Sequence, residues 1–161
     1  SSIGNFAPEE ALRLLRESHA VCREGGAGSG LLIGVDRVKA REVLEPAYDD
    51  ALGVTAAFNR NLLLHVNRQL GSDFQPAAWD HVAFFHARES RIEMHLAARQ
   101  PQTVSWPGGG RTFAAGERIH TENSYKWEPQ AFADLLQQAG FCMPVHWTDA
   151  RGWFSVFWAP A

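Results

Sequence analysis

Residues 31–36 read Leu31-Leu32-Ile33-Gly34-Val35-Asp36, a short continuous apolar run that ends on an aspartate. A run of this kind is typical of a central strand in a parallel sheet, because such a strand has both faces covered. Working outward, Pro8 predicts the start of a helix before the strand, and Pro129 predicts another after it. The sequence therefore predicts an α/β fold that binds its ligand beyond the carboxyl end of the strand.

The middle of the chain follows a different period. Asp49 and Asp50 can cap a long helix that Gly71 closes, since apolar side chains recur at helical spacing between them. Alternation then predicts strands at 81–86, 91–96, 102–106 and 118–125. The turn at 107–110 is expected to join the last two strands. We therefore predict a helix beside a small antiparallel sheet, inserted into the surrounding α/β fold.

The C-terminal segment returns to the first pattern. After the helix that begins at Pro129, residues 141–147 and 153–158 are expected to form a two-stranded hairpin. Without the insert, the chain reads helix, strand, helix and hairpin, which is how a doubly wound sheet can end. The predicted boundaries assign 1–38 and 124–161 to the outer fold and 39–123 to the insert.

Composition excludes several classes of function. The chain has 161 residues, a net charge of −3 and no block of Lys or Arg that could follow a nucleic-acid backbone. No apolar run approaches the roughly 18 residues that suggest a membrane helix. No signal peptide is visible, although a leader upstream is left open. Cys22 and Cys142 are expected to be free thiols of a cytoplasmic protein.

Two further patterns look like sites but have the wrong context. The glycines at positions 25, 26, 28 and 30 precede a strand, whereas a phosphate-binding loop follows a strand and opens a helix. The chain has seven histidines, but none shows the helical spacing with a carboxylate that is typical of a zinc site. We therefore predict a flexible surface loop at the glycines and no bound metal.

Several segments resemble the histidine-specific, S-adenosylmethionine-dependent methyltransferase family of ergothioneine biosynthesis. They are SSIGNF at 1–6 with PEE at 8–10, LLIGVD at 31–36 with VK at 38–39, AYDDA at 47–51, GVTAAFN at 53–59, RIEM at 91–94, TENSYK at 121–126 and WTD at 147–149. The resemblance covers essentially the whole chain. It implies the C-terminal half of a class I, Rossmann-like methyltransferase fold with an inserted α+β substrate-binding domain, the amino acid lying between the two. It also implies N-methylation of the α-amine of a free amino acid, L-histidine, with S-adenosyl-L-methionine bound by the intact protein.

The resemblance implies six substrate-binding residues. They are Asn5 and Tyr48 for the α-carboxylate, Glu122 and Ser124 for the imidazole ring, and Phe58 and Met94 as apolar walls. Positions two apart on a strand point to one face, so a carboxylate and a hydroxyl there can meet both ring nitrogens. An apolar ligand would leave the carboxylate buried and unpaired, which makes the site selective. Without the resemblance, the same residues read as a turn Asn, a half-buried Tyr and a strand face turned to solvent.

Catalytic and cofactor-binding residues stay unassigned in this sequence. The family's glycine-rich cofactor loop and acidic ribose-binding residue precede the segment that resembles residues 1–10. We therefore expect the isolated chain to be inactive and to self-associate through unpaired strand edges. Three alternatives are open: a methyltransferase for another amino acid or amine, a non-catalytic amino-acid-binding module, and a structured fragment without function.

Overall fold

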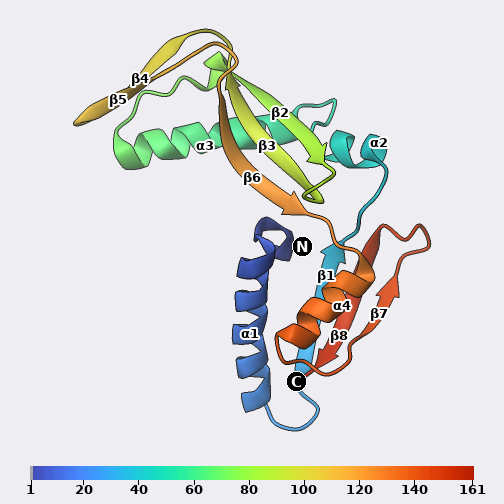
Figure 1. Ribbon diagram of the computed structural model, residues 1–161. Coiled ribbons are helices and arrows are strands. Elements are labelled where there is room, and N and C mark those ends of the chain that lie inside the picture. The colour runs from blue at the N-terminus through green and yellow to red at the C-terminus, as the bar shows by residue number, and fades with distance from the viewer. Residues whose placement is uncertain (1) are drawn as a thin grey trace. The chain divides into compact units, whose positions relative to one another are not determined.

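The computed structural model describes residues 2–161, which form two compact units (Figure 1). The first unit combines the N-terminal part of the chain up to Ala40 with Ala87–Arg91 and Asn123–Ala161. The second unit consists of Arg41–His86 and Ile92–Glu122. Within the described residues, no helix is long and apolar enough to cross a membrane.

The first unit contains helices and one antiparallel sheet. Its elements are η1 (Ser2–Asn5), α1 (Pro8–Glu24), β1 (Gly30–Asp36), α4 (Pro129–Gln138), β7 (Val145–Thr148) and β8 (Phe154–Pro160). The strand order is β1-β8-β7. Strand β1 pairs with β8 along its whole length, from Gly30 opposite Pro160 to Asp36 opposite Phe154. The C-terminal hairpin predicted from the sequence therefore supplies the neighbour of the first strand.

Among the described strands, β1 has no parallel partner. We expected 31–36 to be a central parallel strand, but β1 lies at one end of the sheet order and pairs antiparallel with β8. Its two faces are also unequal, since Val35 is fully buried whereas Leu32 is 65% exposed. A short apolar run reports burial but carries no information on the direction of the neighbouring strand.

Helices α1 and α4 pack on this sheet and enclose the core of the first unit (Figure 1). Phe132 of α4 lies at the centre, with its ring 5.2 Å from that of Phe157 and 5.2 Å from that of Trp127. Helix α1 begins after Ala7, which has no capping side chain. Instead, the carboxylate of Glu10 accepts the Ala7 backbone N–H at 3.0 Å and caps this end.

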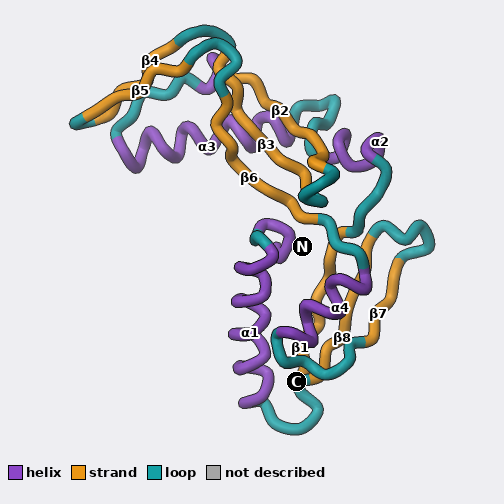
Figure 2. Tube along the Cα trace, in the orientation of Figure 1, coloured by secondary structure: helices purple, strands orange, loops and turns teal. Residues whose placement is uncertain are grey.

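The second unit places one long helix beside short strands, as the tube in Figure 2 shows. Its elements are α2 (Arg41–Leu44), η2 (Glu45–Ala47), α3 (Val54–Leu70), η3 (Pro76–Ala78), β2 (Trp79–His86), β3 (Arg91–Ala98), β4 (Gln102–Trp106), β5 (Gly109–Phe113) and β6 (Arg118–Tyr125). Strands β2, β3 and β6 form one sheet in that order, and β4 pairs only with β5 within the described sheets. The last residues of β6 belong to the first unit.

The long helix of this unit begins as its sequence predicts. The carboxylate of Asp50 accepts the backbone N–H groups of Val54 and Thr55 at 2.9 and 2.8 Å. These hydrogen bonds lower the pKa of Asp50 to about 2, because they favour the ionised carboxylate. Gly71 ends the helix in the left-handed region that glycine tolerates.

The predicted role of the Pro107–Gly110 turn is wrong. We expected it to join 102–106 to 118–125, but it closes β4 onto β5, with Trp106 opposite Gly109. Gly108, with φ of 88°, permits this tight reversal. Strand β5 has two glycines and a single buried residue, so its sequence lacks the alternation that marks a strand. Val104 of β4 and Phe113 of β5 pack with Trp79 and Leu63 in the core of this unit.

The compact units divide the chain after Ala40 and after Glu122, with one addition. Ala87–Arg91, between β2 and β3, belongs to the first unit. Whether the units are a methyltransferase part and an inserted substrate-binding part is a functional assignment, which we propose below.

Candidate substrate site

Strand β6 carries two predicted site residues at alternate positions, Glu122 and Ser124. Both side chains are half-buried. Burial raises the pKa of Glu122, because a carboxylate loses hydration there. The hydroxyl oxygen of Ser124 accepts a hydrogen bond from Lys126 Nζ at 2.9 Å. A carboxyl group and an oriented hydroxyl thus occur two residues apart on one strand.

Ser124 contacts a cluster of charged side chains through Lys126. Lys126 Nζ lies 2.9 Å from Asp36 Oδ2, and its side chain is fully buried. Lys39 binds the other oxygen of the same carboxylate and also donates to the Trp153 carbonyl at 3.1 Å. Burial raises the pKa of Asp36, but the hydrogen bonds and charges of the two lysines outweigh this effect and lower it overall. Asp36, Lys39 and Lys126 therefore form an ion-paired cluster at the carboxyl end of β1.

The turn that carries Asn5 lies against the end of β6. Gly4 is buried in η1, and a Cβ atom there would lie 3.1 Å from the Tyr125 carbonyl oxygen and 3.6 Å from Ser124 Oγ. Only a residue without a side chain permits this approach at no cost. Asn5 follows directly and is exposed. The structure therefore brings the turn before α1 next to Ser124, two segments far apart in the sequence.

Tyr48 ends η2 and is half-buried. Its carbonyl oxygen accepts a hydrogen bond from His81 Nε2 at 2.7 Å, and His81 Nδ1 lies 3.0 Å from Asn59 Nδ2. The amide nitrogen can only donate, so His81 is the neutral tautomer with its proton on Nε2. Asn59 is buried and also donates to the His95 carbonyl at 3.1 Å. This chain of hydrogen bonds fixes the backbone of Tyr48 within the second unit.

A hollow of about 210 Å³ in the second unit brings Phe58 and Glu122 together. Its lining residues come from α3 and β6: Phe58, Asn59, Asn61, Leu62, His65, Thr121 and Glu122. Phe58 is 66% exposed, so its ring is open to a ligand or to further protein. Met94 is not among the lining residues; it is buried on β3, and its carbonyl accepts a hydrogen bond from Thr121 Oγ1 at 3.0 Å.

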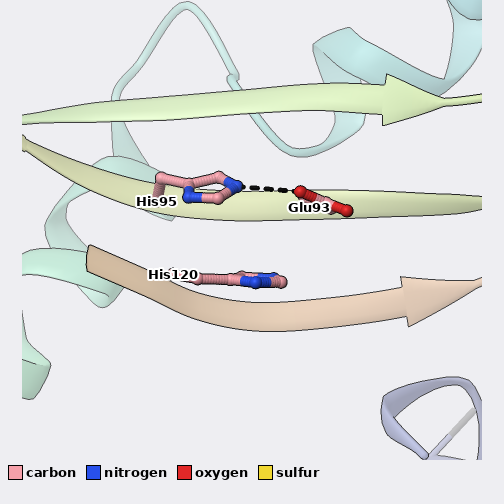
Figure 3. A group of neighbouring side chains, drawn as sticks. All are labelled: Glu93, His95 and His120. Atoms are coloured by element: carbon pink, nitrogen blue, oxygen red, sulfur yellow. Dashed lines mark hydrogen bonds and ion pairs between the residues drawn. The ribbon is translucent and has the colours of Figure 1, made fainter. Parts of the chain in front are cut away.

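Sequence reasoning missed a cluster of Glu93, His95 and His120 on neighbouring strands (Figure 3). One potential metal-ligand atom from each residue lies within 4.8 Å of the others. His95 Nε2 is 3.0 Å from Glu93 Oε2, and the two imidazole rings stack with centroids 4.5 Å apart. The contacts within the cluster are this hydrogen bond and the stacking of the two rings. The sequence signal for this cluster was the pair Glu93 and His95, since side chains two apart on a strand point to the same face.

Burial governs the charge of this stack. Burial lowers the pKa of His95, and this effect exceeds the opposing one of the Glu93 hydrogen bond. A neutral His95 can donate from Nε2 to the carboxylate.

The described residues offer no recognisable cradle for S-adenosylmethionine. The glycines of the loop between α1 and β1 lead into a strand, and Gly26 and Gly28 adopt the left-handed region. A nucleotide-binding glycine loop instead runs from a strand into a helix, whose N-terminus faces the ligand. No cofactor-binding residue is therefore assigned in this chain.

Comparison with known proteins identifies the family. The profile of the SAM-dependent, histidine-specific methyltransferases matches residues 1–161. Histidine N-alpha-methyltransferases of Mycolicibacterium smegmatis and Mycobacterium tuberculosis are each 42% identical over 97% of this chain, which spans 48% of their length. The N-methyltransferase imqF of Aspergillus flavus is 29% identical over 94% of the chain, which covers 42% of that protein. The chain therefore belongs to the histidine-specific, SAM-dependent methyltransferase family.

Proposed function

We propose that the protein to which this chain belongs transfers a methyl group from S-adenosylmethionine to the α-amine of L-histidine. The family match over the whole chain and the names of the two 42% identical relatives support this activity. Because the chain spans about half the length of these relatives, we assign the activity to the longer protein. We also propose a place in ergothioneine-type biosynthesis and, from the free thiols of Cys22 and Cys142, a cytoplasmic location.

For the architecture, we propose that the first unit is the C-terminal part of a class I, Rossmann-like methyltransferase fold. The second unit would then be the inserted substrate-binding domain. Support comes from the order of elements in the first unit, with helices on a sheet whose first strand ends at Asp36. Most of the residues that bind S-adenosylmethionine would then lie in the part of the longer protein that this chain does not span.

Direct methyl transfer to the amine requires no covalent intermediate on the protein. Bound S-adenosylmethionine supplies an electrophilic methyl group. The amine must be neutral and in line, so the side chains of this chain contribute mainly by positioning the amino acid. We propose that Asn5 and Tyr48 hold the α-carboxylate, while Phe58 and Met94 form apolar walls for the ring.

The ring specificity rests on Glu122 and Ser124, and their arrangement is the observation that carries the proposal. They are half-buried at alternate positions of β6, so that both can meet one planar ring. The Glu122 carboxylate accepts the ring N–H, and the Ser124 hydroxyl meets the other nitrogen. Phenylalanine and leucine offer neither group and would leave the carboxylate unpaired.

Calorimetric titration of the full-length protein with the twenty amino acids tests this function, followed by mass spectrometry of the products formed with S-adenosylmethionine. We expect histidine to bind most tightly and to gain mass in steps of one methyl group. A different preferred amine would favour the alternative that the A. flavus relative suggests, since its name specifies N-methylation but not histidine. Binding without methyl transfer would favour a non-catalytic amino-acid-binding module.

A further inference from the structure

We propose that Glu93, His95 and His120 bind a divalent transition-metal ion such as Zn²⁺. Glu93 and His95 lie on β3 and His120 lies on the neighbouring strand β6 (Figure 3). All three residues belong to the second unit, and none is among those that we propose to hold the amino acid. The histidine spacing that argued against a metal concerned ligands on one helix, whereas these ligands lie on two strands.

The three side chains are a donor set that suits zinc. Two imidazoles and one carboxylate are the protein ligands in some zinc sites that keep a further position open for water. One ligand atom from each residue lies within 4.8 Å of the others. Ligand atoms around a tetrahedral zinc ion are about 3.3 Å apart, because each lies about 2.0–2.2 Å from the ion. His95 Nε2 and Glu93 Oε2 are 3.0 Å apart and so already have nearly this spacing.

Two of the three ligands are held in place by the fold. The side chains of His95 and Glu93 are only 12% and 9% exposed. The His95 ring stacks with Phe84 at 5.4 Å and with His120 at 4.5 Å between ring centroids. Asn59 Nδ2 donates to the His95 carbonyl at 3.1 Å and fixes the backbone behind the ring. Ligands fixed on strands in this way lower the cost of ordering a site when an ion binds.

His95 is able to present a lone pair at Nε2. In its hydrogen bond with Glu93 the Nε2 atom carries the proton, since an ionised carboxylate only accepts. Its other nitrogen, Nδ1, is buried and has no hydrogen-bond partner among the described residues. No donor therefore holds Nδ1 as an acceptor, and the proton can move to Nδ1 when an ion takes its place at Nε2. A carboxylate has about four lone-pair sites, so Glu93 can bind an ion and keep its other contacts.

His120 supplies the adjustable ligand and the route of entry. Its side chain is exposed, so an ion can reach the site from solvent. The planes of the His120 and His95 rings meet at 21°, whereas an imidazole binds a metal within the plane of its ring. The exposed ring must therefore tilt out of the stack on binding and give up the 3.2 Å contact between its Nε2 atom and the Glu122 carbonyl.

The test titrates the full-length protein, without an affinity tag and freed of metal by a chelator, with Zn²⁺ in a calorimeter. We expect the wild-type protein to bind a Zn²⁺ ion that His120→Ala weakens by more than about tenfold, since loss of even an outer-shell partner of a metal site costs about 10–100-fold. Glu93→Gln should weaken the same ion. With Co²⁺ as the probe, the wild-type protein should show visible absorption bands of a four- or five-coordinate ion, and His120→Ala should lose them.

His146→Ala is the matched control. The imidazole of His146 is also exposed and also stacks on an aromatic ring, that of Phe157 at 5.0 Å, but it belongs to no group of potential metal ligands within the described part of the chain. This variant should bind Zn²⁺ as the wild-type protein does. Equal binding by the wild-type protein and His120→Ala, or equal losses in both histidine variants, would overturn the inference.

A measurement on the wild-type protein covers the event that the buried Glu93→Gln variant fails to fold. Zn²⁺ should shift the ¹⁵N NMR signals of the His95 and His120 rings by direct coordination and leave those of His146 in place. Shifts confined to other histidines would refute this site. Neither experiment requires histidine binding or methyl transfer, so failure of the proposed function would leave the outcome of both unchanged.

Discussion

At the scale of single residues, substitutions of Glu122 and Asn5 are expected to weaken ligand binding in different ways. Glu122→Ala removes the acceptor for the ring N–H, so histidine should lose roughly 2–4 kcal/mol of binding free energy in the full-length protein. Phenylalanine should lose less, or gain. Asn5→Ala removes a group that holds the carboxylate common to all amino acids, so every ligand should weaken about equally. Titration of both variants with histidine and phenylalanine checks this pair; an unchanged preference in Glu122→Ala contradicts the ring pocket.

The raised pKa of Glu122 also predicts how this side chain affects stability. The folded state binds the Glu122 proton more tightly than the unfolded state, so the ionised carboxylate costs stability above its folded pKa. This cost disappears as the pH falls below the unfolded value. Glu122→Gln should therefore raise the thermal midpoint at neutral pH, without histidine, and the gain should shrink toward pH 4.

Glu117 provides a control of opposite sign for that experiment. The backbone N–H of Ala114 and the Arg111 guanidinium lower its pKa, so its ionised form stabilises the fold. That contribution is present above the unfolded pKa and is lost as the pH falls through the lower folded value. Glu117→Gln should lower the midpoint at neutral pH. A lower thermal midpoint in both Glu122→Gln and Glu117→Gln would argue against a burial effect at Glu122.

At the scale of elements, the start of α3 depends on one carboxylate. Asp50→Ala removes the acceptor for two backbone N–H groups and should lower the unfolding midpoint, whereas Asp49→Ala at the neighbouring position should change it little. The Asp50 contribution is present above the unfolded pKa and is lost as the pH falls through about 2. Thermal unfolding of both variants at pH 7 measures the difference; equal midpoints would show that the helix start is held by other contacts.

Elements were predictable where their signals are local. Pro8, Pro129, Asp50 and Gly71 mark helix ends through φ preference or side-chain capping, and the helices begin or end beside them. Strand partners were not predictable in the same way. The pairing of β1 with β8 joins residues far apart in the sequence, and the proximity of the Asn5 turn to Ser124 depends on Gly4 meeting Tyr125 across the fold. Such contacts are set by packing, which a local pattern does not encode.

At the scale of the whole molecule, the free side of β1 predicts self-association of the isolated chain. Within the described sheets β1 has a partner on one side only, and Leu32 is largely exposed. An unpaired strand edge with apolar side chains recruits another strand. Sedimentation of the 161-residue chain should show association that grows with concentration, and Leu32→Lys should reduce it. A clean monomer at all concentrations would contradict this expectation.

The short segment Ala87–Arg91 has a consequence for recombining this protein with its relatives. Because it belongs to the first unit, the chain passes between units at four points, after Ala40, His86, Arg91 and Glu122. A chimera that exchanges the whole stretch 41–122 would therefore replace part of the recipient's first unit. A graft that exchanges 41–86 and 92–122 replaces only the second unit, because it keeps the recipient's own residues 87–91. Glu122 would then move between relatives with the second segment, whereas Ser124 would stay with the recipient's first unit.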